Sequence, residues 1–263
     1  MILDRARGAA FNDADVAACY AHRAPYAPEL YERLFALAPG RERALDLGCG
    51  PGKIALVLAN RFTAVDAVDP SGPLLQAGQV SDEGRHSNIR WLQSTSEAAN
   101  LVGPYDLVTA GASLHWMRHE VVFPRLAAGL SQGGVMAVIA GDGANDAPWE
   151  GEWGAFLTDW IARMGGRYDK AGFGQAMNAY APWMDVQGRE TFSYAHEQLI
   201  EDFIACQHSR ETWARARMGT ELAREFDDDL RRLLVPHTQG GLLRFSVTSA
   251  LVWGRPRAEP HGA

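Results

Sequence analysis

The chain has 263 residues, of which 25 are basic and 32 acidic, so its formal net charge is −7. A protein that neutralises many phosphates carries an excess of basic side chains, so this balance argues against nucleic acid as a partner. No apolar run approaches membrane-spanning length, and the start of the chain lacks the apolar core of a secretory signal. Three scattered cysteines, Cys19, Cys49 and Cys206, favour free thiols and a cytoplasmic protein.

Residues 1–40 are expected to hold a loose N-terminal arm followed by two helices. Asn12 or Asp13 is a candidate N-cap for the first helix, which Pro25 ends. Residues 29–38 are expected to form the second helix, which stops before a Pro-Gly turn.

The segment ALDLGCGPG, residues 44–52, predicts a strand that runs into a glycine-rich turn. A helix over residues 53–60 and a second strand over residues 63–68 follow, and Asp69 stands at the end of that strand. Glycines let the backbone lie against a ligand, and an acid about twenty residues further on can accept both hydroxyls of a ribose. These residues therefore predict a site for a nucleoside.

The glycine spacing narrows the class of nucleoside. Dinucleotide folds carry G-x-G-x-x-G, whereas this chain has G-C-G-P-G-K, which is one residue shorter and disfavours a nicotinamide oxidoreductase. Asp46 stands two residues before the first glycine, where it can attract an ammonium group. The stretch resembles motif I of the class I methyltransferases that use S-adenosylmethionine (SAM). The resemblance implies that the cofactor contacts Asp46, Gly48, Cys49, Gly50, Gly52, Asp69, Pro70 and Ser71.

Strand and helix patterns alternate through the rest of the first half of the chain. Further strands are expected over residues 89–92, 105–110, 135–140, 189–194 and 242–253, and further helices over residues 70–80, 120–130, 197–207 and 221–234. Alternation of this kind predicts an α/β fold with a Rossmann-like, doubly wound, mostly parallel sheet. The family resemblance implies seven strands in total, with an antiparallel C-terminal strand.

In an open α/β sheet the ligand lies at the carboxyl ends of the strands. Residues 48–52, 69–71, 94–97 and 111–117 follow those ends and are expected to line the crevice. Thr95 and Ser96 occupy the place where related methyltransferases contact the adenine ring, and Gly111 belongs to the segment after the fourth strand.

Two further segments resemble the small-molecule methyltransferases that include the trans-aconitate methyltransferase group. AGASLHWM, from residue 110, is similar to their A-x-x-L-H-W stretch, and YAHRAPYAPEL, from residue 20, is similar to Y-x-x-R-P-x-Y-P-P-x-L. The resemblance implies that Tyr20 and Arg23 contact the amino-acid end of the cofactor and that Tyr26 reaches the substrate. Arg23 suits a carboxylate of the cofactor or the substrate, and a surface salt bridge is the alternative.

His115 is the candidate catalytic residue. The unperturbed pKa of a histidine side chain lies near neutrality, so His115 can act as a general base toward a hydroxyl acceptor, or it can orient the loop or the cofactor. Trp116 beside it is expected to form a wall of the acceptor pocket. His119 follows at helical spacing, but H-x-x-x-H-E lacks a third ligand, and a helix start explains His119 and Glu120. No metal is predicted.

Residues 146–240 are dense in aromatic side chains and are expected to form a helical lid with acceptor-pocket elements and the sixth strand. Trp153, Phe156 and Trp160 fall on one helix face and are interpreted as core. The loop aromatics Trp149, Tyr168 and Tyr180 are assigned to the acceptor pocket. Residues 41–145 are then the SAM-binding core, and residues 241–263 the final strand and tail.

The sequence thus predicts a SAM-dependent methyltransferase that acts on a small molecule, with the oxygen of a hydroxyl or a carboxylate as the first choice. Methylation of carbon or nitrogen remains an alternative, because the same cofactor site serves all three atoms. A protein that keeps the SAM site but acts as a non-catalytic accessory is a further alternative.

Overall fold

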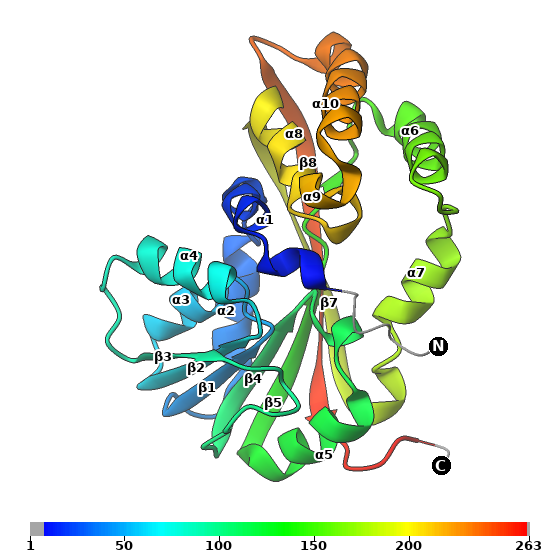
Figure 1. The fold of residues 1–263 in the computed structure, drawn as a ribbon. Coiled ribbons are helices and arrows are strands. Elements are labelled where there is room, and N and C mark those ends of the chain that lie inside the picture. Colours follow the sequence, from blue (N-terminus) through cyan, green and yellow to red (C-terminus); the bar gives the residue numbers. More distant parts are fainter. Residues whose placement is uncertain (1–7, 262–263) are drawn as a thin grey trace. The chain divides into compact units, whose positions relative to one another are not determined.

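The computed structural model describes residues 8–261, so the expected arm over residues 1–7 and the last two residues of the expected tail lie outside the described part. The chain divides into two compact units (Figure 1). The helical unit consists of Met1–Pro25, Asp142–Gly174 and Ser193–Thr248. The sheet unit consists of Tyr26–Gly141, Gln175–Phe192 and Ser249–Ala263.

Five parallel strands form the centre of the sheet unit, in the order β3-β2-β1-β4-β5. They are β1 (Arg43–Leu47), β2 (Ala64–Asp69), β3 (Ile89–Gln93), β4 (Tyr105–Gly111) and β5 (Leu130–Ala140). The strands β1, β2 and β4 are buried almost throughout, as their apolar sequences require of strands covered on both faces. The predicted doubly wound, mostly parallel sheet is confirmed.

Helices cover both faces of this sheet. Figure 1 shows α2 (Pro28–Leu37), α3 (Ala55–Ala59) and α4 (Gly72–Asp82) on one face and α5 (His119–Gly129) on the other. The Ser71 hydroxyl accepts the Leu74 N–H at 3.2 Å and so caps α4. Val122, Phe123 and Leu126 of α5 are buried in the core that the strands share.

The antiparallel part of the sheet is larger than the sequence suggests. The final strand, β8 (Leu242–Pro256), pairs antiparallel with β5 and also pairs with β7 (Met184–Leu199). Both strands are longer than expected. An eighth strand, β6 (Ala144–Asn145), is absent from the sequence-based prediction. It forms because Asn145 has a register partner on β8 and its side-chain oxygen also accepts the Thr248 N–H at 3.2 Å.

The helical unit contains the aromatic cluster and most of the remaining helices. These are α1 (Ala14–Cys19), α6 (Glu150–Arg163), the start of α7 (Lys170–Met177), α8 (Ile200–His208), α9 (Arg215–Met218) and α10 (Thr220–Leu234). The short 3-10 helices of the chain are η1 (Ala9–Asn12), η2 (Tyr20–His22), η3 (Leu114–Trp116), η4 (Ala181–Trp183), η5 (Glu211–Trp213) and η6 (Val235–His237). The helices α7 and α9 are absent from the sequence-based prediction.

Phe226 of α10 lies at the centre of the aromatic cluster. Its ring stacks on Trp213 with centroids 5.0 Å apart and meets Trp160 edge-on at 5.2 Å. Trp160 is fully buried, as its helical spacing predicts, whereas Trp153 and Phe156 are partly buried beside it.

The first helix and the cysteines follow the sequence in most respects. The Asp13 carboxylate accepts the Asp15 N–H at 2.8 Å, which identifies Asp13 rather than Asn12 as the cap of α1. The helix ends at Cys19 instead of running to Pro25, and η2 continues from it. The three cysteines are buried free thiols. Among the described residues, no helix is both long and apolar enough to cross a membrane.

Candidate functional site

The glycine turn after β1 has a backbone that other residues cannot easily adopt. Gly48, Gly50 and Gly52 have φ values of 62°, 53° and 81°, in the left-handed region. A Cβ on Gly48 would lie 2.4 Å from the Cβ of Ser113, and a Cβ on Gly52 would lie 2.6 Å from the Trp91 ring. The three glycines therefore allow the turn to form at the carboxyl end of β1.

Asp69, at the carboxyl end of β2, is hydrogen-bonded to this turn. Its Oδ2 atom accepts the Gly50 N–H at 2.8 Å, and its Oδ1 atom accepts the Ser71 N–H at 2.8 Å. Burial raises the pKa of Asp69, and the two backbone N–H groups oppose that rise. Each carboxylate oxygen has a second lone-pair site, so Asp69 can still accept hydrogen bonds from a ligand.

Asp46 is a buried residue of β1 and stands two residues before the same glycine turn. Its Oδ2 atom accepts the Ala55 N–H at 3.1 Å, and its Oδ1 atom accepts the Thr109 hydroxyl at 2.8 Å. Burial is the largest cause that raises the pKa of Asp46 to about 7, although both hydrogen bonds act against it. Burial and the nearby carboxylates also raise the pKa of the Cys49 thiol, which fits a small packing residue rather than a nucleophile.

The turn after β4 joins the glycine turn through Ser113. The Ser113 hydroxyl donates to the Leu47 carbonyl at 2.7 Å, and η3, which carries His115 and Trp116, follows directly. The His115 and Trp116 rings have centroids 4.7 Å apart, and both side chains are half-buried. The His119 Nε2 atom lies 2.9 Å from the Leu114 carbonyl, so this imidazole closes the turn by donating to it.

Tyr26 lies close to the end of β4. A Cβ on Gly111 would lie 3.1 Å from the Tyr26 hydroxyl and 2.8 Å from the Ile54 side chain. Gly111 thus leaves room for Tyr26, which is buried beside the residues that follow the glycine turn.

Arg125 holds the loop after β3 in place. The Ser94 N–H donates to the Asp69 carbonyl at 3.1 Å, and the Arg125 guanidinium donates to the Ser96 and Glu97 carbonyls at 2.6 and 2.7 Å. Thr95 is exposed and Ser96 is buried. This loop and the loops after β1, β2 and β4 follow carboxyl ends of parallel strands, where ligands bind in such sheets.

The three loop aromatics that the sequence assigns to the acceptor pocket have different surroundings. Trp149 belongs to the helical unit and is buried in its core, where it meets Phe203 edge-on at 5.4 Å. Tyr168 is exposed, and Tyr180 is buried in the core of the sheet unit. Packing accounts for Trp149 and Tyr180 without a ligand.

Tyr20 and Arg23 belong to the helical unit, and Arg23 has partners of its own there. Its guanidinium donates to the Ser209 hydroxyl at 2.7 Å and to the Ser209 carbonyl at 2.9 Å. It also forms an ion pair with Asp142 at 3.2 Å and lies 3.9 Å from the centroid of the Tyr20 ring. These contacts favour the salt-bridge alternative for Arg23, in a buried rather than a surface setting.

The sequence reasoning missed Thr109, and it included Ser113 only as part of the segment 111–117, without a role of its own. Thr109 is the lone hydroxyl in the apolar part of β4, and a polar residue inside a buried strand signals a buried partner, here Asp46. The contact of Ser113 with Leu47 joins residues 66 positions apart, and no local pattern reveals it.

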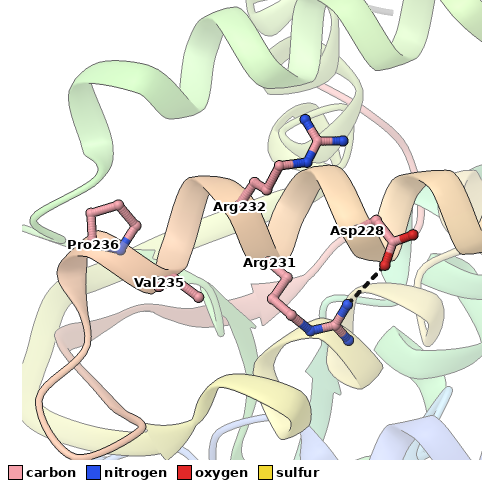
Figure 2. Close-up of a pocket in the computed structure, with 5 residues that line it drawn as sticks. All are labelled: Asp228, Arg231, Arg232, Val235 and Pro236. Carbon is pink, nitrogen blue, oxygen red and sulfur yellow. Dashed lines mark hydrogen bonds and ion pairs between the residues drawn. The ribbon is translucent and has the colours of Figure 1, made fainter.

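A hollow on the helical unit lies along the end of α10 and η6 (Figure 2). Its charged side chains form ion pairs. Arg231 pairs with Asp228 at 3.1 Å and with Glu201 at 2.8 Å, and Arg232 pairs with Asp229. None of the residues singled out from the sequence lines it. Its lining residues are Asp228, Arg231, Arg232, Val235 and Pro236.

Comparison with known proteins finds a family match over part of the chain and relatives that are similar over about half of it. Residues 44–134 match the family described as "Methyltransferase domain". A trans-aconitate 2-methyltransferase of Variovorax paradoxus is 31% identical over 146 residues, which cover 50% of this chain and 56% of that protein. An uncharacterized methyltransferase of Mycobacterium tuberculosis (strain H37Rv) is 34% identical over 134 residues, covering 49% and 64%. The chain therefore spans little more than half the length of these relatives.

One solved structure resembles the chain over most of its length. A chain from Anaeromyxobacter dehalogenans, described as a candidate type II methyltransferase, gives a TM-score of 0.70 at 22% identity and covers 91% of this chain and 99% of its own. At this identity the likeness concerns the fold.

Proposed function

We propose that the chain is a cytoplasmic, SAM-dependent enzyme that methylates an oxygen atom of a small molecule, starting from the match of residues 44–134 to a methyltransferase domain. The observation that carries the proposal is the hydrogen bond between Asp69 and the glycine turn. It joins a carboxylate that can accept ribose hydroxyls to a backbone that has no side chains at Gly48, Gly50 and Gly52.

The residues at this edge suit each part of SAM. Asp69 would accept the ribose hydroxyls, and the backbone of the glycine turn would lie along the nucleoside. Asp46, buried two residues before the turn, would attract the ammonium group. When bound, SAM supplies a methyl group on a sulfonium, which is transferred by an in-line displacement. The main task of the protein is then to align acceptor and donor.

His115 can serve the acceptor in two ways. A hydroxyl must lose its proton as the methyl group arrives, and the imidazole could take that proton. A carboxylate acceptor is already ionised at neutral pH, so His115 would then only orient it. If His115 is a base, the variant His115→Gln loses activity most strongly on phenols and alcohols. Equal activity of both proteins at every pH would exclude the base.

The relatives named trans-aconitate 2-methyltransferase support an acid as the acceptor. The same name recurs in relatives from Variovorax paradoxus and Delftia acidovorans, at 31% and 35% identity. We therefore take the first acceptor class to be a small carboxylic acid, methylated on a carboxylate oxygen.

The test is transfer of labelled methyl from SAM to a panel of carboxylic acids, phenols, amines and activated carbon acids, together with a calorimetric titration of SAM. Label in the carboxylic acids supports the proposal. Label in amines or carbon acids alone replaces oxygen with another acceptor atom. SAM binding without any transfer favours a non-catalytic SAM-binding protein, and a protein that binds no SAM contradicts the proposal.

A further inference from the structure

Two segments of the sheet unit that follow different strands are joined by side chains. One is the β3 loop, residues 94–99, and the other is the β4 turn, residues 112–118, which includes η3. The strands β3 and β4 do not pair, because β2 and β1 lie between them (Figure 1). The connection between the two segments therefore depends on the contacts of individual residues.

Glu97 of the β3 loop contacts the end of the β4 turn. Its Oε1 atom accepts the Arg118 N–H at 2.8 Å. Arg118 is the N-cap residue of α5, and its own side chain makes no capping hydrogen bond. The Glu97 carboxylate thus acts in place of a local cap, at the helix end where the dipole of α5 favours a negative charge.

Arg125 of α5 makes the second connection, in the opposite direction. Its Nη1 atom donates to the Ser96 and Glu97 carbonyls at 2.6 and 2.7 Å, and its Nη2 atom donates to the Ala99 carbonyl. Hydrogen bonds from a charged donor are stronger than those between neutral groups. Arg125 is half-buried and Ser96 and Ala99 are buried, so water competes little for these contacts.

The β3 loop is also joined to the predicted cofactor site. The Ser94 N–H donates to the Asp69 carbonyl at 3.1 Å, and the Asp69 carboxylate accepts the Gly50 N–H of the glycine turn. At its other end the β4 turn leads directly into α5. A chain of hydrogen bonds thus runs from the glycine turn through the β3 loop to Arg118, three residues after His115.

We propose that Glu97 and Arg125 are positioning residues, through which the nucleoside part of SAM holds the turn that carries His115. The proposal rests on the proposed function, which places SAM at the ends of these strands and assigns the acceptor to His115. A nucleoside bound against the β3 loop restricts that loop, and the loop restricts Arg118 and the start of α5. The cofactor thereby prepares the acceptor side of the site before the acceptor binds.

The experiment measures how methylthioadenosine changes amide hydrogen exchange in the two segments. This ligand has the nucleoside of SAM and lacks its amino-acid end. The reporters in the β4 turn are the amides of Trp116 and Met117, which donate to the Ser113 and Leu114 carbonyls at 3.0 Å each. These hydrogen bonds do not involve the side chain at position 97, so the reporters are sensitive to the ligand rather than to the substitution alone.

The variants are Glu97→Ala, Glu97→Asp, Glu97→Gln and Arg125→Met. Glu32→Ala and Arg61→Met are the matched controls, because Glu32 and Arg61 form an exposed ion pair of the same unit, at 2.8 Å. Calorimetry gives the affinity of each protein for methylthioadenosine, and hydrogen exchange is then measured at saturation. Thermal unfolding shows which variants are folded.

In the wild type, methylthioadenosine is expected to slow exchange at Trp116 and Met117 as well as in the β3 loop. Glu97→Ala should keep its affinity and the slowing in the β3 loop, but the slowing at the two reporters should fall by about 10-fold, because one charge-assisted hydrogen bond is lost. Glu97→Gln should restore it, since its amide oxygen can still accept the Arg118 N–H.

Arg125→Met is expected to act on the ligand itself. The β3 loop loses three carbonyl contacts, so the affinity for methylthioadenosine should fall by about 10-fold. Both control variants should match the wild type in affinity and in exchange.

Undiminished slowing at Trp116 and Met117 in folded Glu97→Ala overturns the proposal. Glu97→Asp, whose shorter side chain draws the carboxylate back, gives the same comparison if Glu97→Ala does not fold. A wild type in which methylthioadenosine protects the β3 loop alone overturns it too. A role in stability alone would lower the melting temperature and leave the ligand-induced slowing intact. The proposed function fails in a different way, because the wild type then binds neither SAM nor methylthioadenosine.

Discussion

Two buried carboxylates, Asp46 and Asp69, lie at the carboxyl ends of neighbouring strands and have different surroundings. Asp69 accepts two backbone N–H groups, whereas Asp46 accepts one backbone N–H and one hydroxyl. Burial raises the pKa of both, and it raises that of Asp46 to about 7. The two residues therefore allow separate predictions, one for stability and one for ligand binding.

Asp46 is expected to make the protein less stable as the pH rises from about 4 to about 7. Its pKa is 3.8 in the unfolded chain and about 7 in the folded protein, so between these values the folded state binds more protons. Its stabilising contribution is complete below pH 3.8 and is lost as the pH rises through 7. The side chain at this position cannot ionise in Asp46→Asn. The free energy of unfolding of this variant, minus that of the wild type, should therefore increase as the pH rises.

Urea denaturation of both proteins at pH 5, 6, 7 and 8 measures this difference. The comparison at each pH cancels the groups that titrate in both proteins. If the two stability profiles run parallel, Asp46 is ionised throughout the range and the prediction is wrong.

Asp69→Asn is expected to weaken SAM binding by at least about 100-fold while leaving a folded protein. An amide can accept only one of the two backbone N–H groups and turns donors toward the other and toward the ribose hydroxyls. Asp106→Asn is the matched control. Asp106 is also a buried carboxylate that accepts a backbone N–H, from Glu42 at 3.0 Å, but it lies near the amino end of β4.

Calorimetric titration measures the affinity of each variant for SAM. It is carried out at a temperature at which thermal unfolding shows each variant to be folded. Asp106→Asn should lose stability but keep its affinity. Wild-type affinity in Asp69→Asn would remove Asp69 from the cofactor site.

Among the elements, α10 depends most on aromatic packing. Phe226 contacts Trp213 of η5 and Trp160 of α6, so one side chain joins three helices of the helical unit. Phe226→Ala should lower the free energy of unfolding by about 3–5 kcal/mol, because it removes buried apolar surface and leaves a cavity. Phe226→Leu refills much of that volume and should cost about 1 kcal/mol.

Chemical denaturation followed by tryptophan fluorescence and by circular dichroism gives both values. Equal losses for the two variants would show that the volume of the side chain is not what matters. No loss in Phe226→Ala would contradict the central place of Phe226 in this core.

The sequence predicts some elements well and misses others for physical reasons. The turn after β1 can be predicted because glycine adopts its three positive φ values more readily than other residues do. The helix α9 has four residues and β6 has two, too few for a hydrophobic period to show. The sequence predicts this strand only from residue 135, after two glycines, whereas β5 begins at Leu130 and its pairing with β4 changes register between Tyr105 and Leu107.

The candidate site also has residues that the sequence predicts and contacts that it does not. The sequence predicts the residues at strand ends, because strand order and parallel pairing bring those ends to one edge. It cannot predict that Ser209 and Asp142 engage Arg23, because these contacts join residues 186 and 119 positions apart.

At the scale of the whole molecule, the ligand is predicted to bind at the carboxyl ends of the parallel strands. The loops at their amino ends are predicted to make no contact with it. The loops after β1, β2, β3 and β4 follow the carboxyl ends of parallel strands, and the Asp69 and Ser113 hydrogen bonds link all four of them. Bound S-adenosylhomocysteine should therefore slow amide hydrogen exchange in these loops together. Their residues are 48–52, 69–72, 94–97 and 111–117.

Hydrogen exchange with mass spectrometry, with and without S-adenosylhomocysteine at about 100 times its dissociation constant, tests the prediction. Binding at that level stabilises the folded state by about 2.7 kcal/mol, so any exchange that requires global unfolding slows everywhere. The test therefore depends on amides that exchange through local opening. Residues 61–63 and 101–104, before β2 and β4, are the internal control. Local protection there, without protection of the glycine turn, would place the ligand at the amino edge and contradict the assignment of Asp69 and the glycines.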